Sequence, residues 1–139
     1  MKDRHLFKAT RLDNEEWVRG NLIYTFTGTP YIVAEYDHII NLINIDEVDP
    51  ATICQCTGLK DKNGKLIWEN DIVKRTDKPK AGEPTIGIIE YDIANTAFLI
   101  RWIDNPNYSP MFPWEEKIQI VGNKFDYKFD EGGTTSGKN

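Results

Sequence analysis

Residues 55–73 read Gln-Cys-Thr-Gly-Leu-Lys-Asp-Lys-Asn-Gly-Lys-Leu-Ile-Trp-Glu-Asn-Asp-Ile-Val, and this is the most informative stretch of the chain. Asn63-Gly64 predicts a tight type I′ turn, because both central residues of that turn need positive φ, which Asn and Gly adopt at little cost. Gly58 and Asn70 are two further candidates for positive φ. Trp68 ends a short apolar run, and its large indole favours burial against a neighbouring sheet. The predicted order is strand, turn, aromatic anchor, polar corner and second strand.

Two acidic residues, Glu69 and Asp71, occupy the polar corner and allow two interpretations. Two carboxylates at this spacing could bind a metal or, together with His38, move protons in an enzyme. Acids beside turn residues more commonly accept hydrogen bonds from backbone N–H groups. A catalytic site needs several groups that converge in a cleft, and the sequence shows no complete set. We therefore expect Asp71 to hold the corner, and we expect no enzyme activity, no catalytic residue and no cofactor.

With its residues laid out, the stretch resembles the hallmark of the YopX family of small phage and prophage proteins, which runs approximately Gln-Tyr-Thr-Gly-Leu-x-Asp-x-Asn-Gly-x-x-Ile-Tyr-Glu-Gly-Asp-Ile-Val. The matching positions are Gln55, Thr57, Gly58, Leu59, Asp61, Asn63, Gly64, Ile67, Glu69, Asp71, Ile72 and Val73. Three positions depart, because Cys56 and Trp68 replace tyrosines and Asn70 replaces a glycine. We take as the candidate structural hallmark Gly58, Asn63, Gly64, Trp68, Glu69 and Asp71.

The resemblance covers roughly residues 1–125, strongly in the middle and loosely at the ends. It implies a mostly β fold whose later half is a small SH3-like β-barrel, and it attaches no biochemical activity to the chain. On this basis residues 54–125 form a region of hallmark and barrel. Residues 126–139 are predicted to be a disordered tail, because they end in a polar run rich in Gly, Thr and Ser.

The residues before the hallmark predict an antiparallel β-meander, which makes 1–53 an N-terminal β-rich region. Alternating apolar and polar positions indicate three strands, at 5–11, 17–27 and 31–36. Short connections of this kind join neighbouring antiparallel strands. Residues 38–48 fit either one face of a helix or a strand. We favour a strand, because the run is short and β-branched Ile suits a sheet.

After the hallmark, residues 76–84 are polar and rich in Lys, Pro and Gly, and they predict a mobile loop of the kind that commonly carries recognition. Further strands are predicted at 85–92, 97–103 and 117–122. Residues 104–113 predict an irregular loop with several large apolar side chains around it. The candidate interaction residues are Tyr108, Met111, Phe112 and Trp114. They form either a patch for a partner or a lid that folds back over the barrel.

The formal net charge of −5 disfavours a general nucleic-acid binder, because phosphate contacts need clustered Lys and Arg. The charge is uneven, however: residues 60–80 carry seven basic and four acidic side chains, so this segment is +3 and the remainder is −8. A basic segment on an acidic body could contact nucleic acid or an acidic partner. Lys-rich turns are more often solvated edges that discourage strand aggregation. Weak nucleic-acid binding through residues 60–80 is therefore the alternative function.

Cys54 and Cys56 lie two residues apart, so on a strand both side chains face the same side. With His5 or His38 such a pair could ligate zinc, but zinc sites usually have two-residue spacers and a second ligand pair. We expect two buried, reduced thiols and no metal. No apolar run approaches the ~20 residues of a membrane span, and no signal peptide is recognisable, so we expect a cytoplasmic protein of the host bacterial cell with no membrane partner.

Together these observations predict a phage or prophage accessory protein that acts as a non-enzymatic interaction module. Its expected partners are further copies of itself in a homo-oligomer, or an unidentified phage or host protein. Folds of this kind host many unrelated functions, so the fold by itself identifies no partner.

Overall fold

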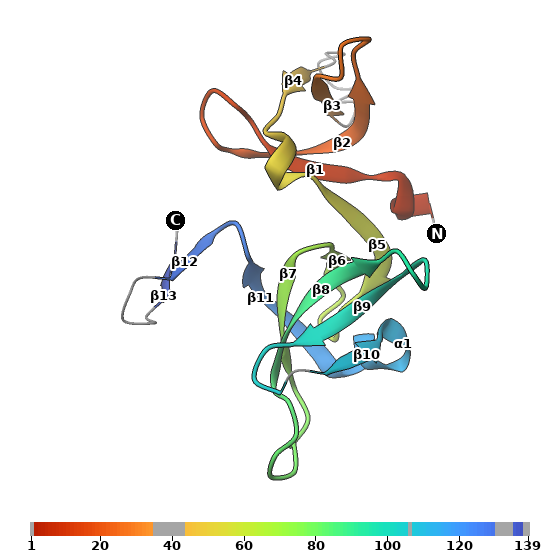
Figure 1. Ribbon diagram of the computed structural model, residues 1–139, viewed down its shortest axis with the longest axis vertical. Helices are drawn as coiled ribbons and strands as arrows, with labels where there is room; N and C mark the ends of the chain where they lie inside the picture. Colours follow the sequence, from red (N-terminus) through yellow and green to blue (C-terminus); the bar gives the residue numbers. More distant parts are fainter. Residues whose placement is uncertain (1, 35–43, 106, 130–134, 138–139) are drawn as a thin grey trace. The chain divides into compact units, whose positions relative to one another are not determined.

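Figure 1 shows the computed structural model, which describes residues 2–34, 44–105, 107–129 and 135–137. Across these residues the chain divides into two compact units, Met1–Cys56 and Thr57–Asn139. Antiparallel strands predominate in both units, so the predicted mainly β class is confirmed. The helical elements in the described residues are short: η1 (Lys2–His5), η2 (Pro50–Thr52), α1 (Met111–Trp114) and η3 (Glu115–Lys117). No described helix has the length and apolar character needed to cross a membrane.

The first unit is an antiparallel meander, as predicted. Its strands are β1 (Phe7–Thr10), β2 (Trp17–Tyr24), β3 (Pro30–Ala34) and β4 (Ile45–Glu47), in the spatial order β4-β3-β2-β1. The start of β5 (Cys54–Lys60) pairs with β1 and places Gln55 opposite Phe7. β4 confirms the strand prediction for the described part of 38–48, whereas 38–43 lies outside the described residues.

A small apolar core covers one face of this meander. Its buried members are Ala9, Ile32 and Val48, with Phe7, Val18, Leu22 and Ile53 packed against them. The strand register explains the grouping, because side chains of directly paired residues share a face, as Leu22 does with Ile32. Gly20 lets β2 and β3 approach each other closely, since a Cβ at this position would lie 2.0 Å from the Val33 carbonyl oxygen.

The second unit contains a sheet of five antiparallel strands in its described residues, in the order β10-β9-β8-β7-β11. These strands are β7 (Asp71–Arg75), β8 (Ile86–Asp92), β9 (Ala97–Trp102), β10 (Tyr108–Pro110) and β11 (Ile118–Asn123). The remainder of β5 pairs with β6 (Leu66–Trp68). The pairing of β7 with β11 shifts register between Ile120 and Gly122, which marks a β-bulge near the end of β11.

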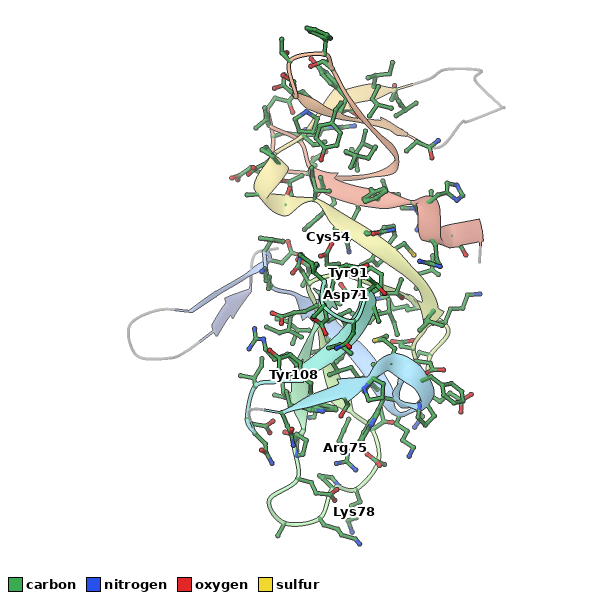
Figure 2. The ribbon with its side chains drawn as sticks, turned by 45° about the vertical axis from the view of Figure 1, so that its right-hand side comes forward. Cys54, Asp71, Arg75, Lys78, Tyr91 and Tyr108 are labelled. Atoms are coloured by element: carbon green, nitrogen blue, oxygen red, sulfur yellow. The ribbon has the colours of Figure 1, made fainter. Side chains whose placement is uncertain are left out.

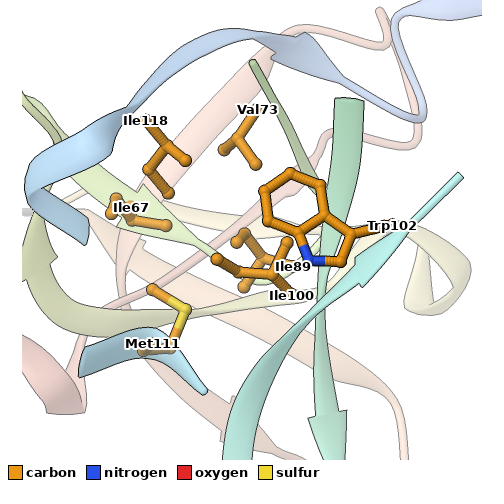
Figure 3. Packing of buried hydrophobic residues seen from close by; sticks show 7 residues of the cluster. All are labelled: Ile67, Val73, Ile89, Ile100, Trp102, Met111 and Ile118. Atoms are coloured by element: carbon orange, nitrogen blue, oxygen red, sulfur yellow. The ribbon is translucent and has the colours of Figure 1, made fainter. Parts of the chain in front are cut away.

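The core of the second unit, shown in Figure 3, brings together apolar side chains from β6, β7, β8, β9, α1 and β11. Its buried members are Ile67, Val73, Ile89, Ile100, Trp102, Met111 and Ile118. Ile100 and Trp102 lie on the inner face of β9, while Ile103, just past the end of β9, is 47% exposed. The sheet therefore has one covered face and one face that retains exposed apolar residues, which is common for antiparallel sheets.

Two predicted segments are described differently by the structure, and one fold detail is not confirmed. The loop predicted over 104–113 contains β10, in which Tyr108 pairs with Arg101 of β9. In the tail predicted to be disordered, β12 (Tyr127–Phe129) pairs with β13 (Thr135–Gly137). No pairing among the described residues joins the edge strands β10 and β11, so a closed barrel is not confirmed.

Candidate interaction surface

The turn of the hallmark hairpin, between β5 and β6, differs from the predicted type I′ turn. Gly64 has a φ of +81°, but Asn63 is not among the residues with positive φ. The Gly64 N–H donates to the Asp61 carbonyl at 3.0 Å, and the Asp61 N–H donates to the Lys65 carbonyl at 2.8 Å. A glycine with positive φ as the last residue of a four-residue turn is the pattern of a three-residue hairpin loop. The type I′ prediction is therefore wrong for Asn63, which does not have positive φ, and correct for Gly64, which does.

Asp61 explains why this longer loop is preferred. Asp61 is buried, and one of its carboxylate oxygens accepts the N–H groups of Asn63 and Lys65 at 2.9 Å each. The other carboxylate oxygen accepts the N–H of Ile120 on β11 at 2.9 Å. Asp61 therefore closes the turn and at the same time attaches it to a distant strand, which makes it a structural residue.

The polar corner between β6 and β7 is held by Asp71, as predicted. One Asp71 oxygen accepts the Trp68 N–H at 2.8 Å, and the other accepts the Asn123 side-chain amide at 3.3 Å. Asp71 is 2% exposed, and the indole of Trp68 is buried beside it. Asn70 has the predicted positive φ, +72°, and its N–H donates to the Ile89 carbonyl at 2.8 Å. The Asp71 carboxylate is thus engaged in holding the corner.

The remaining hallmark residues also have defined places. Gly58 lies on β5 with a φ of +82°, as predicted. Glu69 is half-buried at the same corner as Asp71, and His38 lies outside the described residues.

The four candidate interaction residues at 108–114 separate into two pairs. Met111 is buried in the core, and Trp114 packs against that core with its ring 5.2 Å from Trp102, at 69°. Tyr108 and Phe112 instead point to solvent, with exposed fractions of 59% and 76%. The segment is therefore part lid and part patch, and neither sequence interpretation fits all four residues.

Arg75 and Lys117 both stack on Trp114 at the base of the β7–β8 connection. The Arg75 guanidinium lies 4.9 Å from the Trp114 ring centre, and the Lys117 ammonium lies 5.4 Å from it. Arg75 also binds Asp77 in bidentate fashion, at 2.7 and 2.9 Å, and lies 3.7 Å from Glu83. Hydrogen bonding to Asp77 raises the pKa of Arg75, and the reciprocal bond lowers the pKa of Asp77.

The β7–β8 connection, residues 76–85, forms a narrow projection beyond the sheet (Figures 1 and 2). Figure 2 shows Lys78 near its end and Arg75 nearer the sheet. Lys78 and Lys80 are exposed and have no ion-pair partner among the described residues. Arg75 pairs with Asp77 and Glu83, the two acidic residues of the projection. Lys78 and Lys80 therefore dominate the charge near the tip of the projection.

The far leg of the projection is fixed by Asp104. This carboxylate accepts the Thr85 N–H at 3.0 Å and the Ile86 N–H at 3.3 Å, and it also accepts the Thr85 hydroxyl. The bond from the Thr85 side chain is the main cause that lowers the pKa of Asp104. Both ends of the projection are therefore attached to the sheet by charged hydrogen bonds.

A hollow of about 430 Å³ lies at the opposite end of β8. It is lined by Glu90, Tyr91, Asp92, Asn95, Leu99 and Tyr108. The register builds it, because Glu90 pairs with Leu99, and β10 adds Tyr108 one strand further along the sheet. Glu90 also forms an ion pair with Arg101 at 2.9 Å. Sequence reasoning identified Tyr108 and missed the other five residues, since only the strand register brings them together.

Cys54 and Cys56 are both buried, as predicted, and no disulfide involves them. The Cys54 thiol donates to the Thr52 carbonyl at 3.2 Å. No group of three or more His, Cys, Asp and Glu side chains among the described residues is arranged to hold a metal ion. The zinc interpretation with His5 therefore finds no ligand cluster within the part of the chain that is described, and its other proposed ligand, His38, lies outside that part.

Comparison with known proteins extends over most of the chain. Residues 6–126 match the family described as YopX protein. This match includes the first unit from Leu6 onward, the hallmark stretch and the whole five-stranded sheet. No curated protein matches the chain.

Proposed function

The chain belongs to the YopX protein family, and from this premise we propose that it is a non-enzymatic, self-associating interaction module of a bacteriophage or prophage. The observation that carries the proposal is the division of the 108–114 segment. Met111 and Trp114 are fixed in the core, so they hold Tyr108 and Phe112 in place at the surface. Exposed aromatic side chains on a rigid support favour binding, because little conformational entropy is lost when they are covered.

The roles of the hallmark acids support a non-enzymatic function. Asp61 and Asp71, the most buried acids of the hallmark, are engaged with backbone and amide N–H groups that hold the fold. A general acid or base must instead reach a substrate in a cleft. The cytoplasm of a bacterial host is the proposed location, because buried thiols that form no disulfide suit a reducing compartment.

For the second unit we also propose the finer fold assignment, a small and incompletely closed SH3-like barrel. Two contacts support it across the gap between the hallmark hairpin and β11. The Lys62 N–H donates to the Ile118 carbonyl at 3.0 Å, and Asp61 accepts the Ile120 N–H at 2.9 Å. Slow amide hydrogen exchange at Lys62 and Ile120 is expected if the hairpin closes the barrel at this point. Rapid exchange at both amides would count against this assignment.

Self-association is tested by light scattering over a range of protein concentrations. The wild-type chain should form oligomers whose population rises with concentration, and Phe112→Ser should weaken them. Phe26→Ser is the matched control, because Phe26 is a fully exposed aromatic residue in the first unit. A wild-type chain that stays monomeric at the highest concentration would overturn self-association, and equal effects of both variants would remove Phe112 from the interface.

Weak nucleic-acid binding through residues 60–80 is the second candidate. It is favoured by the exposed lysines of the hallmark hairpin and of the projection, which are Lys60, Lys62, Lys65, Lys78 and Lys80. It is opposed by the commitment of Arg75 to Asp77 and by the net charge of −5. A mobility-shift titration at low salt tests it, and no shift at micromolar protein would exclude it.

A further inference from the structure

We propose that the β7–β8 projection of one copy docks its lysines into the hollow at the other end of β8 in a second copy, so that the chains assemble head to tail. This docking rests on the self-association proposed above and assigns the two surfaces that meet. It is carried by the charge and shape of two features of the second unit. One is the lysine-tipped projection, and the other is the hollow lined by acids and tyrosines.

The hollow suits a lysine side chain. Glu90 and Asp92 supply carboxylates, Leu99 supplies an apolar surface for the aliphatic stem, and Tyr108 supplies a ring face and a hydroxyl. The Tyr91 ring packs against Phe98 instead. The described hydrogen bonds of Asp92 go to the Ala94 N–H and to the Asn95 amide, within its own turn. Because each carboxylate has roughly four acceptor positions, acceptor capacity remains after these bonds and after the Glu90–Arg101 pair.

The size of the hollow matches one or two side chains rather than a whole domain. Its volume of about 430 Å³ lies near the lower end of the range for binding pockets. The projection is a narrow two-legged loop with Lys78 near its end (Figure 2), and its exposed lysines are Lys78 and Lys80. Asp77 and Glu83 on its legs are already engaged by Arg75, so the tip offers positive charge to an acidic acceptor.

The two surfaces cannot meet within one chain. β8 runs Ile86–Asp92, so the projection precedes its first residue and the hollow includes its last. A strand of this length spans on the order of 20 Å, and both ends of the projection are fixed to the sheet. Docking therefore requires a second copy, and the contact is heterologous, because a projection meets a hollow. Such contacts produce closed rings or open filaments rather than an isolated two-fold dimer.

Sedimentation velocity of the full chain over a concentration series tests the docking. Lys78→Glu/Lys80→Glu should raise the dissociation constant of self-association by about tenfold or more, and 0.5 M salt should weaken the wild-type assembly. Lys60→Glu/Lys62→Glu is the matched control, because it makes the same charge change on the exposed hallmark hairpin. Wild-type assembly that withstands the projection variant and salt overturns the docking while self-association stands.

A complementation experiment tests the head-to-tail arrangement itself. Asn95→Lys should block the hollow, because it places an ammonium group beside Asp92, and Asn63→Lys is its exposed control. Asn95→Lys and Lys78→Glu/Lys80→Glu should each be monomeric alone. Mixed in equal amounts, they should form a dimer that grows no further, because one intact projection meets one intact hollow. A mixture that remains monomeric, while each variant keeps the wild-type circular dichroism spectrum, overturns the proposal.

Failure of this docking can be told apart from failure of the proposed function. A wild-type chain that is monomeric throughout removes self-association and the docking together. A wild-type chain that assembles, but responds to Phe112→Ser and not to the projection or hollow variants, removes only the docking.

Discussion

The Asp61 carboxylate accepts the N–H of Ile120 at 2.9 Å, so a turn residue of the hallmark hairpin positions a strand that lies 59 residues later in the chain. The same carboxylate accepts two N–H groups of its own turn. A single side chain therefore fixes the shape of the hairpin and its place against β11.

Replacement of Asp61 by Ala is expected to destabilise the second unit by about 3 kcal/mol, because three backbone donors lose a charged acceptor. Asp61→Asn should cost less, since an amide oxygen can still accept from part of this set. Urea unfolding measures the change, and Lys62→Ala on the same exposed turn is the control. A loss below about 0.5 kcal/mol for Asp61→Ala would contradict this role.

The stability of variants at Asn70 should depend on how readily the new residue adopts positive φ rather than on the size of its side chain. Its φ of +72° lies in the left-handed region, which costs most residues about 1–2 kcal/mol and glycine almost nothing. We expect Asn70→Gly to leave the stability close to that of the wild type and Asn70→Val to lower it by more than about 1 kcal/mol. Chemical denaturation would measure both, and equal losses would rule out the backbone explanation.

Gly20→Ala is expected to damage the first unit more than Gly87→Ala damages the second. A Cβ at position 20 would lie 2.0 Å from the Val33 carbonyl oxygen, and backbone of a paired strand cannot move aside. A Cβ at position 87 would meet the Ile100 side chain at 2.6 Å, which can shift in part. We expect losses of roughly 3 kcal/mol or more and roughly 1–2 kcal/mol, measured by thermal unfolding. The reverse order would contradict the packing described for β2 and β3.

Stability should fall in acid because of Asp77 and Asp104. Their pKa values in the folded chain are lowered from 3.8, by the bonds from Arg75 and Thr85 respectively. A lowered folded pKa means that the stabilising contribution is present above pH 3.8 and is lost as the pH falls below that value. Unfolding by urea between pH 7 and pH 2 checks this.

Asp104→Asn should make the stability less dependent on pH in that window. Identical pH profiles for wild type and Asp104→Asn would contradict the contribution of the Thr85 bonds.

The local backbone conformation of the hallmark was largely predictable from its residue types. Gly58, Gly64 and Asn70 have positive φ as expected, because conformations of that kind depend on the residue itself more than on distant contacts. Trp68 is buried and Asp71 accepts a backbone N–H, again through groups that lie within a few residues. The meander of the first unit followed from alternation and short turns for the same reason.

Features set by distant contacts were not predictable. The turn at Asn63 differs from type I′ because Asp61 bonds both its own turn and Ile120, and nothing in the local sequence indicates the second partner. Met111 and Phe112 are adjacent, yet one is buried and the other is exposed. Their separation depends on where α1 meets the sheet. The hollow beside Tyr108 likewise requires the register of three strands, which no single segment specifies.

Arg75 has a consequence for engineering and for natural variation of this chain. By binding Asp77, Glu83 and the Pro84 carbonyl, it joins the two legs of the projection below the tip. Changes in the residues between the legs should therefore have little effect on the folding of the sheet. The tip should accept insertions, a fluorophore or a peptide from another protein without loss of the fold, so that its binding properties can diverge while the scaffold stays the same.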